Sequence, residues 1–219
     1  CLAMNLSAAT SPRTALRTAT AADHGRVDRL FGDGLRLPGD YLTYLLGTSV
    51  ALTLPAMILI YTLTGTLDFT VGGILAGKAD ASTVALLLVL LVFGFAKAAV
   101  MPLHGWLPAA MVAPTPVSSF LHGVAVVKVG VFSILRMVFF VFGTGLLTDL
   151  NLGTVLTTLA SVTVLAASLV ALTQDNLKRR LTYSTIGQLS YMILGAGMLT
   201  AAGMGGGLMH LSMHAFGKI

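Results

Sequence analysis

The sequence contains no glutamate and few charged residues of any kind. Only 10% of its 219 residues are charged, 56% are hydrophobic, and the mean hydropathy is +0.90. Soluble domains usually carry about a quarter charged residues, so this scarcity excludes an ordinary soluble domain. Long apolar stretches recur along the chain, which predicts an all-α, polytopic transmembrane helix bundle.

Cysteine is also scarce, with one residue at position 1. A single cysteine excludes an internal disulfide bond and a thiolate metal cluster. The chain lacks a charged leader followed by a small-residue cleavage site, so no signal peptide is predicted. The first residue is not methionine and the last apolar run ends without a helix cap. We therefore expect a piece of a longer protein, cut at both ends.

Residues 1–40 are predicted to form a basic cytoplasmic loop, and residues 41–219 a transmembrane domain whose last helix is truncated. About six spans are expected, including one broken helix. They are placed at residues 41–64, from 83 to a break at Pro102 and Pro108, 116–141, 154–172, 185–199, and from 208 onward. The break is predicted because proline lacks a backbone donor. The glycine-rich stretch 203–207 is expected to form the turn before the last span.

Basic residues predict how the spans are oriented. Lys178, Arg179 and Arg180 lie in a polar stretch between two spans, which the positive-inside rule places in the cytoplasm. Alternating outward from this stretch puts the five arginines of residues 1–40 on the same side. Lys78 is then the only basic loop residue predicted to lie outside.

Lys128 lies in the middle of a predicted span. It follows Pro116 by twelve residues and precedes Val141 by thirteen, which is about 18 Å from either end at the rise of an α-helix. A lysine side chain does not reach water over that distance. An ammonium at this depth costs about 2.5–3.5 kcal/mol, so an ionisable residue here is a candidate functional site. The alternative is a structural lysine held against backbone carbonyls between helices.

Lys97 lies beside the predicted helix break. Broken helices at membrane depth are tolerated where they line a cavity, and transporters build ion sites at them. The alternative is that the side chain simply extends along the helix toward water.

Histidines form a second group of candidates. His210, His214 and Lys218 are spaced four residues apart, which places them on one helical stripe. Two histidines at this spacing can bind zinc, but no acidic or cysteine ligand lies nearby, so the row fits proton hopping better. His122 shares a span with Lys128 about 120° round the helix, and His104 lies in the break. Either can also be an ordinary core histidine.

Burial disfavours a charged amine, so a buried lysine or histidine can take up and release a proton near neutral pH. Every aspartate falls in a predicted loop. A carboxylate that holds one of these lysines charged must therefore come from outside this chain.

Four separated blocks resemble the antiporter-like membrane subunits of Mrp-type multisubunit Na+/H+ antiporters and of respiratory complex I. The blocks are residues 64–69, 93–132, 175–199 and 208–219. The segments VAVVKVGVF and HAFGKI are more similar to the D-type subunits of these antiporters than to the complex I subunits. The A-type antiporter subunits belong to the same family. The resemblance implies about fourteen helices built from two inverted five-helix repeats.

The resemblance also implies residue roles. Lys97 matches the lysine on the family's broken helix, which pairs with a glutamate on an earlier helix. Lys128 and His122 match the central relay, and His210, His214 and Lys218 match the link to a second half-channel. This chain would then contain the middle of a proton path and neither complete half of it.

The predicted function is a proton-translocating subunit of a multisubunit monovalent cation/H+ antiporter in the bacterial inner membrane. The alternative is a proton-pumping subunit of an NADH:quinone oxidoreductase (complex I) or of a membrane hydrogenase. An intramembrane enzyme would need an acid or metal-ligand set within the membrane, and a purely structural subunit does not explain Lys128. No cofactor, metal, nucleic acid or chemistry of its own is expected. The expected partners are other membrane subunits, the lipid bilayer, protons and Na+.

Overall fold

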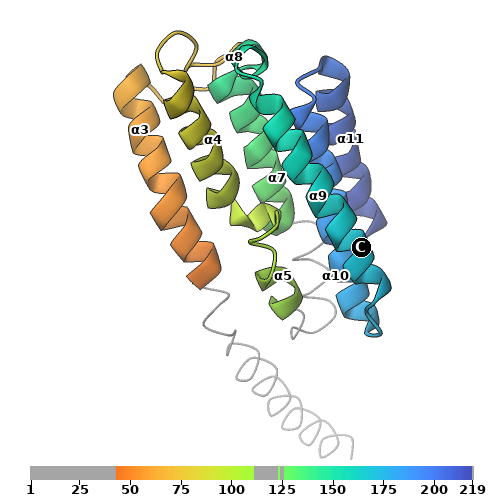
Figure 1. Ribbon diagram of the computed structural model, residues 1–219. Coiled ribbons are helices and arrows are strands. Elements are labelled where there is room, and N and C mark those ends of the chain that lie inside the picture. Colours follow the sequence, from red (N-terminus) through yellow and green to blue (C-terminus); the bar gives the residue numbers. More distant parts are fainter. Residues whose placement is uncertain (1–42, 111–122, 124–125, 219) are drawn as a thin grey trace, which may run out of the picture. The chain divides into compact units, whose positions relative to one another are not determined.

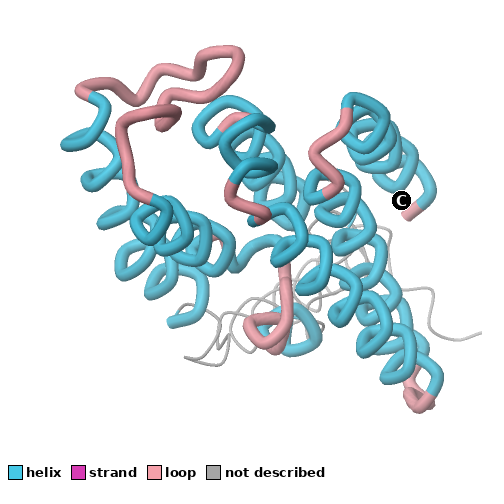
Figure 2. The backbone as a smooth tube through the Cα atoms, turned by 45° about the horizontal axis from the view of Figure 1, so that its top comes forward, coloured by secondary structure: helices cyan, strands magenta, loops and turns pink. Residues whose placement is uncertain are grey.

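The computed structural model describes residues 43–110, 123 and 126–218. Within these residues all regular structure is helical, and the long helices run side by side (Figures 1 and 2). This confirms the predicted all-α membrane bundle. The cytoplasmic loop predicted at residues 1–40 lies outside the described residues.

The first span is helical throughout residues 43–64. Two π-helical turns, η1 (Thr43–Gly47) and η2 (Ser49–Thr53), lead into α3 (Leu54–Thr64). Gly65 ends the helix with a φ of +75°, a left-handed conformation that glycine adopts without strain. In the described part of the chain, Leu45–Thr64 and Leu152–Leu172 are each long and apolar enough to cross a membrane on their own.

The broken helix ends earlier than its prolines predict. Helix α4 (Ala81–Gly94) stops eight residues before Pro102, and a 3-10 turn, η3 (Ala96–Ala98), follows it. Ala99 then adopts a left-handed backbone conformation with a φ of 54°, which no α-helix accommodates. The chain resumes as the short helix α5 (Trp106–Ala109), so Pro108 lies inside a helical turn.

The middle of the chain forms two spans joined by a short helix. Helix α7 (Val126–Arg136) continues into η5 (Met137–Phe142), which is π-helical. Helix α8 (Thr144–Asp149) occupies the connector that the sequence predicts as a loop, and α9 (Leu152–Leu172) follows it.

Helix α10 (Leu177–Gly197) begins eight residues before the predicted start of its span. The Asn176 side chain accepts hydrogen bonds from the backbone N–H groups of Lys178 and Arg179, at 3.0 and 3.5 Å. This N-cap stabilises the first turn, so the basic run is helical rather than a loop.

Helix α11 (Ala201–Gly217) includes the glycine run that the sequence predicts as a turn, and that prediction is wrong. Thr200 caps its start by accepting from Gly203 N. A Cβ atom on Gly195 would lie 2.7 Å from Gly203 O, so small residues here allow α10 and α11 to approach closely.

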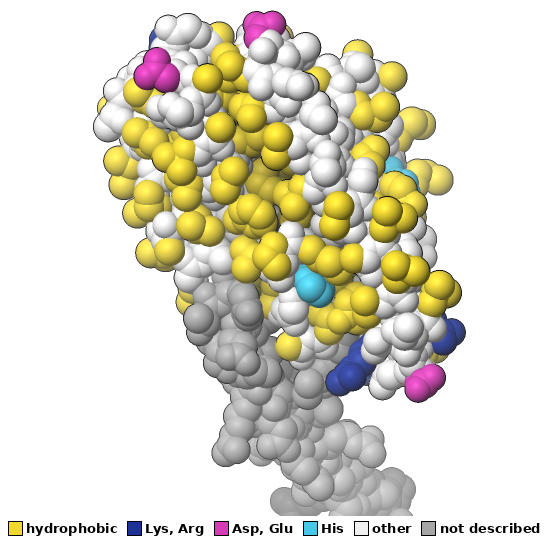
Figure 3. All heavy atoms as spheres, viewed as in Figure 1, with side chains coloured by type: hydrophobic (Ala, Val, Ile, Leu, Met, Phe, Trp, Pro, Cys, Tyr) yellow, Lys and Arg dark blue, Asp and Glu magenta, His cyan; other side chains and the backbone are white. Residues whose placement is uncertain are grey.

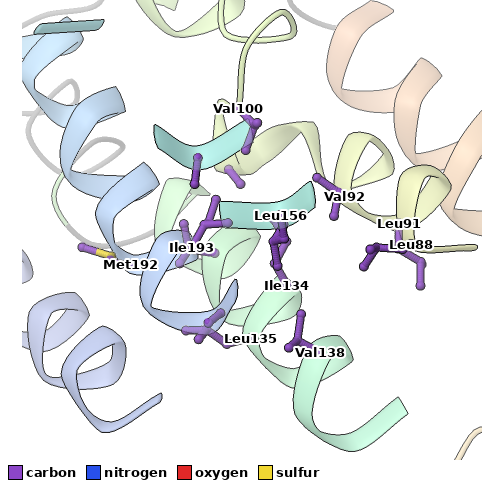
Figure 4. Packing of buried hydrophobic residues seen from close by; sticks show 14 of the residues in the cluster. Leu88, Leu91, Val92, Val100, Ile134, Leu135, Val138, Leu156, Met192 and Ile193 are labelled. Atoms are coloured by element: carbon purple, nitrogen blue, oxygen red, sulfur yellow. The ribbon is translucent and has the colours of Figure 1, made fainter. Parts of the chain in front are cut away.

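A buried apolar cluster joins α4, α7, α9 and α10, and Figure 4 shows side chains from all four meeting. Large apolar side chains also cover the outside, including Val162, Leu165 and Leu169 on α9, each more than half exposed. Charged side chains lie near the ends of the helices in the view of Figure 3. An apolar exterior with charge at the ends is what a bilayer requires.

Candidate functional site

The candidate site is a row of basic side chains between α7, α10 and α11. Lys128 projects from α7 and is only 5% exposed. Its Nζ contacts Nδ1 of His214 on α11, although 86 residues separate the two in sequence. His214 is 8% exposed, so both nitrogens of this contact lie away from bulk solvent.

His210 lies one turn before His214 on α11. The two imidazole rings stack with centroids 6.2 Å apart and 25° between their planes. His210 Nε2 lies 2.7 Å from Oε1 of Gln188 on α10, so in this arrangement the imidazole donates and the amide oxygen accepts. Nε2 of His214 is buried and has no hydrogen-bond partner among the residues that the structure describes. This ring nitrogen of His214 is therefore available to a further donor or acceptor.

Lys218 continues the row beyond the end of α11. Its Nζ donates to Leu181 O at 3.2 Å and to Ser184 Oγ at 3.4 Å, both in the first turns of α10. The predicted stripe of His210, His214 and Lys218 thus faces α10. Lys128 meets the middle of this stripe at His214, while His210 lies beside Gln188 in the middle of α10 and Lys218 lies beside Leu181 near its start.

Lys97 occupies a different setting. It lies in η3, is half-buried, and forms no hydrogen bond or ion pair with any residue that the structure describes. The segment nevertheless packs directly on α7, because a Cβ atom on Gly130 would lie 2.6 Å from the carbonyl carbon of Lys97. The main chain at Lys97 is therefore adjacent to the helix that carries Lys128.

His104 and the two prolines lie in the break. The ring of His104 is 6.1 Å from that of Tyr183 on α10. Its Nδ1 is buried and finds no hydrogen-bond partner in the described part of the chain. Pro102 is exposed and Pro108 is half-buried. His122 lies outside the described residues.

The row contains no anion. Asp68, Asp80, Asp149 and Asp175 are all exposed. Across residues 43–110 and 126–218, no three His, Cys or acidic side chains converge on a point where they could hold a metal ion. Two positive charges in contact repel strongly in a low-dielectric site, so Lys128 and His214 can share one proton far more readily than they can hold two.

Sequence reasoning missed Gln188 and Ser184, which supply acceptors to the row. A usable signal was present, since Ser184, Gln188 and Tyr191 recur at spacings of four and three in an otherwise apolar stretch. That spacing places polar side chains on one face of a helix. The Tyr191 ring lies 6.5 Å from that of His210, edge to face.

The family model described as NADH:quinone oxidoreductase/Mrp antiporter, TM, matches residues 40–219. The chain is 37% identical over 169 residues to NAD(P)H-quinone oxidoreductase chain 5 of Synechocystis sp., covering 73% of this chain and 23% of that protein. It is 38% identical over 172 residues to the chloroplastic subunit 5 of Zygnema circumcarinatum, covering 74% and 23%.

A solved structure is also similar. A chain in the Mrp complex from Dietzia sp. superposes with a TM-score of 0.68 and 32% identity, covering 81% of this chain and 20% of that one. The present chain therefore spans about a quarter or less of the length of the proteins it matches.

Proposed function

Because this chain belongs to the family of NADH:quinone oxidoreductase and Mrp antiporter membrane subunits, we propose that it forms the middle of a proton path in a multi-pass membrane protein. The observation that carries this proposal is the buried contact between Lys128 Nζ and His214 Nδ1. A buried amine and a buried imidazole in contact can exchange a proton, whereas a structural lysine would be expected to bind backbone carbonyls.

The path runs along the row of basic groups. A proton on Lys128 passes to Nδ1 of His214, and the imidazole then releases a proton from its unpartnered Nε2. The ring centroids of His214 and His210 are 6.2 Å apart, so a bridging water molecule is needed between them. Lys218 lies on the opposite side of His214 from His210, beside Leu181 and Ser184 near the start of α10, and takes a proton from His214 toward that end.

Lys97 and His104 form the entrance in this proposal. Lys97 lies in the helix break beside α7, and the unpartnered Nδ1 of His104 offers a site for water in the same segment. Irregular backbone within a membrane is tolerated where it lines such a polar path. His122 belongs to the same path by resemblance. Pro102 lies between η3 and α5, where it lacks the N–H that a continuous helix would need, and Pro108 lies within α5.

The whole protein is proposed to be a subunit of a multisubunit monovalent cation/H+ antiporter in the bacterial inner membrane, with other membrane subunits as partners. The similarity to a chain of the Mrp complex supports this choice. The second candidate is a redox-driven proton pump, which the similarity to NAD(P)H-quinone oxidoreductase chain 5 favours.

Everted membrane vesicles that contain the full-length protein in its native complex distinguish the two candidates. The pH gradient is recorded after addition of NaCl and, separately, of NADH. The antiporter proposal predicts a response to NaCl that Lys128→Ala abolishes and that Lys78→Ala retains. Lys78 is a matched control because it is an exposed lysine in the connector between α3 and α4, where its Nζ donates to Thr64 O at the end of α3.

A response to NADH alone, lost in Lys128→Ala, would move the protein to the redox-driven branch. Unchanged responses in Lys128→Ala would show that Lys128 is structural and would refute the proton path.

A further inference from the structure

Arg136 forms a cluster with three aromatic rings at the end of α7, away from the basic row. Its guanidinium carbon lies 3.9 Å from the ring centroid of Phe69 and 5.7 Å from that of Phe132. The Phe69 ring in turn meets Phe140 edge to face, with centroids 6.4 Å apart. Phe69 belongs to the connector between α3 and α4, so the cluster joins two parts of the chain.

Main-chain contacts fix the position of the connector that carries Phe69. The backbone N–H groups of Ile74 and Leu75 donate to Val141 O, at 2.9 and 3.2 Å. Gly73 abuts the main chain of Phe142, leaving no room for a side chain. These contacts hold the connector against the end of η5. The Phe69 ring that covers the guanidinium therefore belongs to a segment held in place by main-chain hydrogen bonds.

No described residue forms an ion pair with Arg136. Among the residues that the structure describes, Arg136 forms no hydrogen bond and no ion pair, and its side chain is exposed. The neighbouring carboxylate, Asp68, accepts instead from Thr66 Oγ1 at 3.1 Å. All five N–H donors of the guanidinium are thus available to an external acceptor.

The helix face that carries Arg136 is apolar and exposed in this chain. Arg136, Phe132 and Val129 lie on one face of α7, and Phe132 and Val129 are 43% and 55% exposed. Arg136 precedes Gly143, where η5 ends, by seven residues, which is about 10 Å along a helix. A long arginine side chain reaches the headgroup level from that depth.

We propose that Arg136 and its aromatic cluster bind the phosphate of an anionic phospholipid. Rings lie over the guanidinium and leave its edge open, and that edge presents parallel N–H groups that match a phosphate oxygen pair. The exposed apolar face of α7 below it receives the acyl chains. The lipid contacts the end of the bundle opposite the basic turn that begins α10.

The test uses the full-length protein in its native complex, purified in detergent and mixed with phosphatidylglycerol or with phosphatidylcholine. Native mass spectrometry counts the lipids retained. Wild type is expected to retain one more phosphatidylglycerol than Arg136→Gln does. Arg136→Lys and Phe69→Leu are expected to retain it at a reduced fraction, because they lose the planar fork or the stacked ring. Lys78→Gln, on the same connector, should match wild type.

Equal retention of phosphatidylglycerol by wild type and Arg136→Gln would overturn the proposal. So would equal retention of phosphatidylcholine at this site, or loss of the bound lipid on adding inorganic phosphate, which would show a free-anion site. If Arg136→Gln fails to assemble, Phe69→Leu decides, since it keeps the charge. Full lipid retention by Phe69→Leu would then show that the cluster does not hold the lipid.

Discussion

Lys128 and Lys97 lie on segments that pack against each other, yet their side chains differ in almost every respect. Lys128 is buried in a regular helix and contacts His214, whereas Lys97 is half-buried in a 3-10 turn and has no partner among the described residues. The partner of Lys128 is supplied by this chain. The described residues therefore supply a buried partner for Lys128 and none for Lys97.

Replacing Lys128 by leucine gives the largest expected effect. Transport should fall by about a hundredfold or more, the range of a positioned proton-transfer group. The melting temperature should fall only modestly, because leucine avoids the burial of an amine but leaves Nδ1 of the buried His214 without its partner. Transport in vesicles and thermal unfolding of the purified complex measure the two. A large loss of stability would mean that Lys128 holds the helices together.

Of the two histidines of α11, the one that contacts Lys128 is expected to matter more for transport. His214→Asn is expected to reduce transport by about a hundredfold and His210→Asn by about tenfold. His214 is buried and contacts Lys128 directly, whereas His210 is half-buried and bonded to Gln188. Initial transport rates at matched expression test this order, and an equal or reversed order would contradict the row as drawn.

A side chain at Gly130 should separate the two lysine segments. Gly130→Ala places a methyl group against the main chain of Lys97 and Ala98, which is expected to cost about 1–3 kcal/mol of stability. Gly145→Ala is the matched control in a helix with open space around it, and it should be neutral or stabilising by up to about 1 kcal/mol. Thermal unfolding compares them, and equal melting temperatures would contradict the close packing.

Gln188→Leu is expected to have the smallest effect. It removes the acceptor 2.7 Å from His210 Nε2, a bond that contributes about 1 kcal/mol. Transport should fall only a few-fold, because His210 stays in place. A loss as large as that of His214→Asn would show that Gln188 belongs to the path itself.

Much of the fold follows from the sequence, because long apolar runs fix helices in a membrane. The first span and α9 lie close to their predicted bounds. Local features caused the errors. The break begins at Gly94 and Ala99, where backbone conformation matters more than proline, and the Asn176 cap turns a basic run into helix.

The contact at the centre of the site could not be predicted from the residues alone. The stripe of His210, His214 and Lys218 follows from helical spacing, but its direction does not. It meets Lys128 because α10 packs against both α7 and α11, and that depends on glycines such as Gly195 and Gly203 allowing a close approach. The sequence analysis places Gly203 in a turn and gives Gly195 no packing role.

A double-mutant cycle on transport tests most directly whether Lys128 and His214 act as one proton-sharing pair. Initial rates would be measured for Lys128→Ala, His214→Ala and the double variant in the same vesicles. If the pair is a unit, the double variant should be no slower than the slower single variant, because the first substitution already breaks the path. Losses that multiply would show two independent residues and would contradict the account.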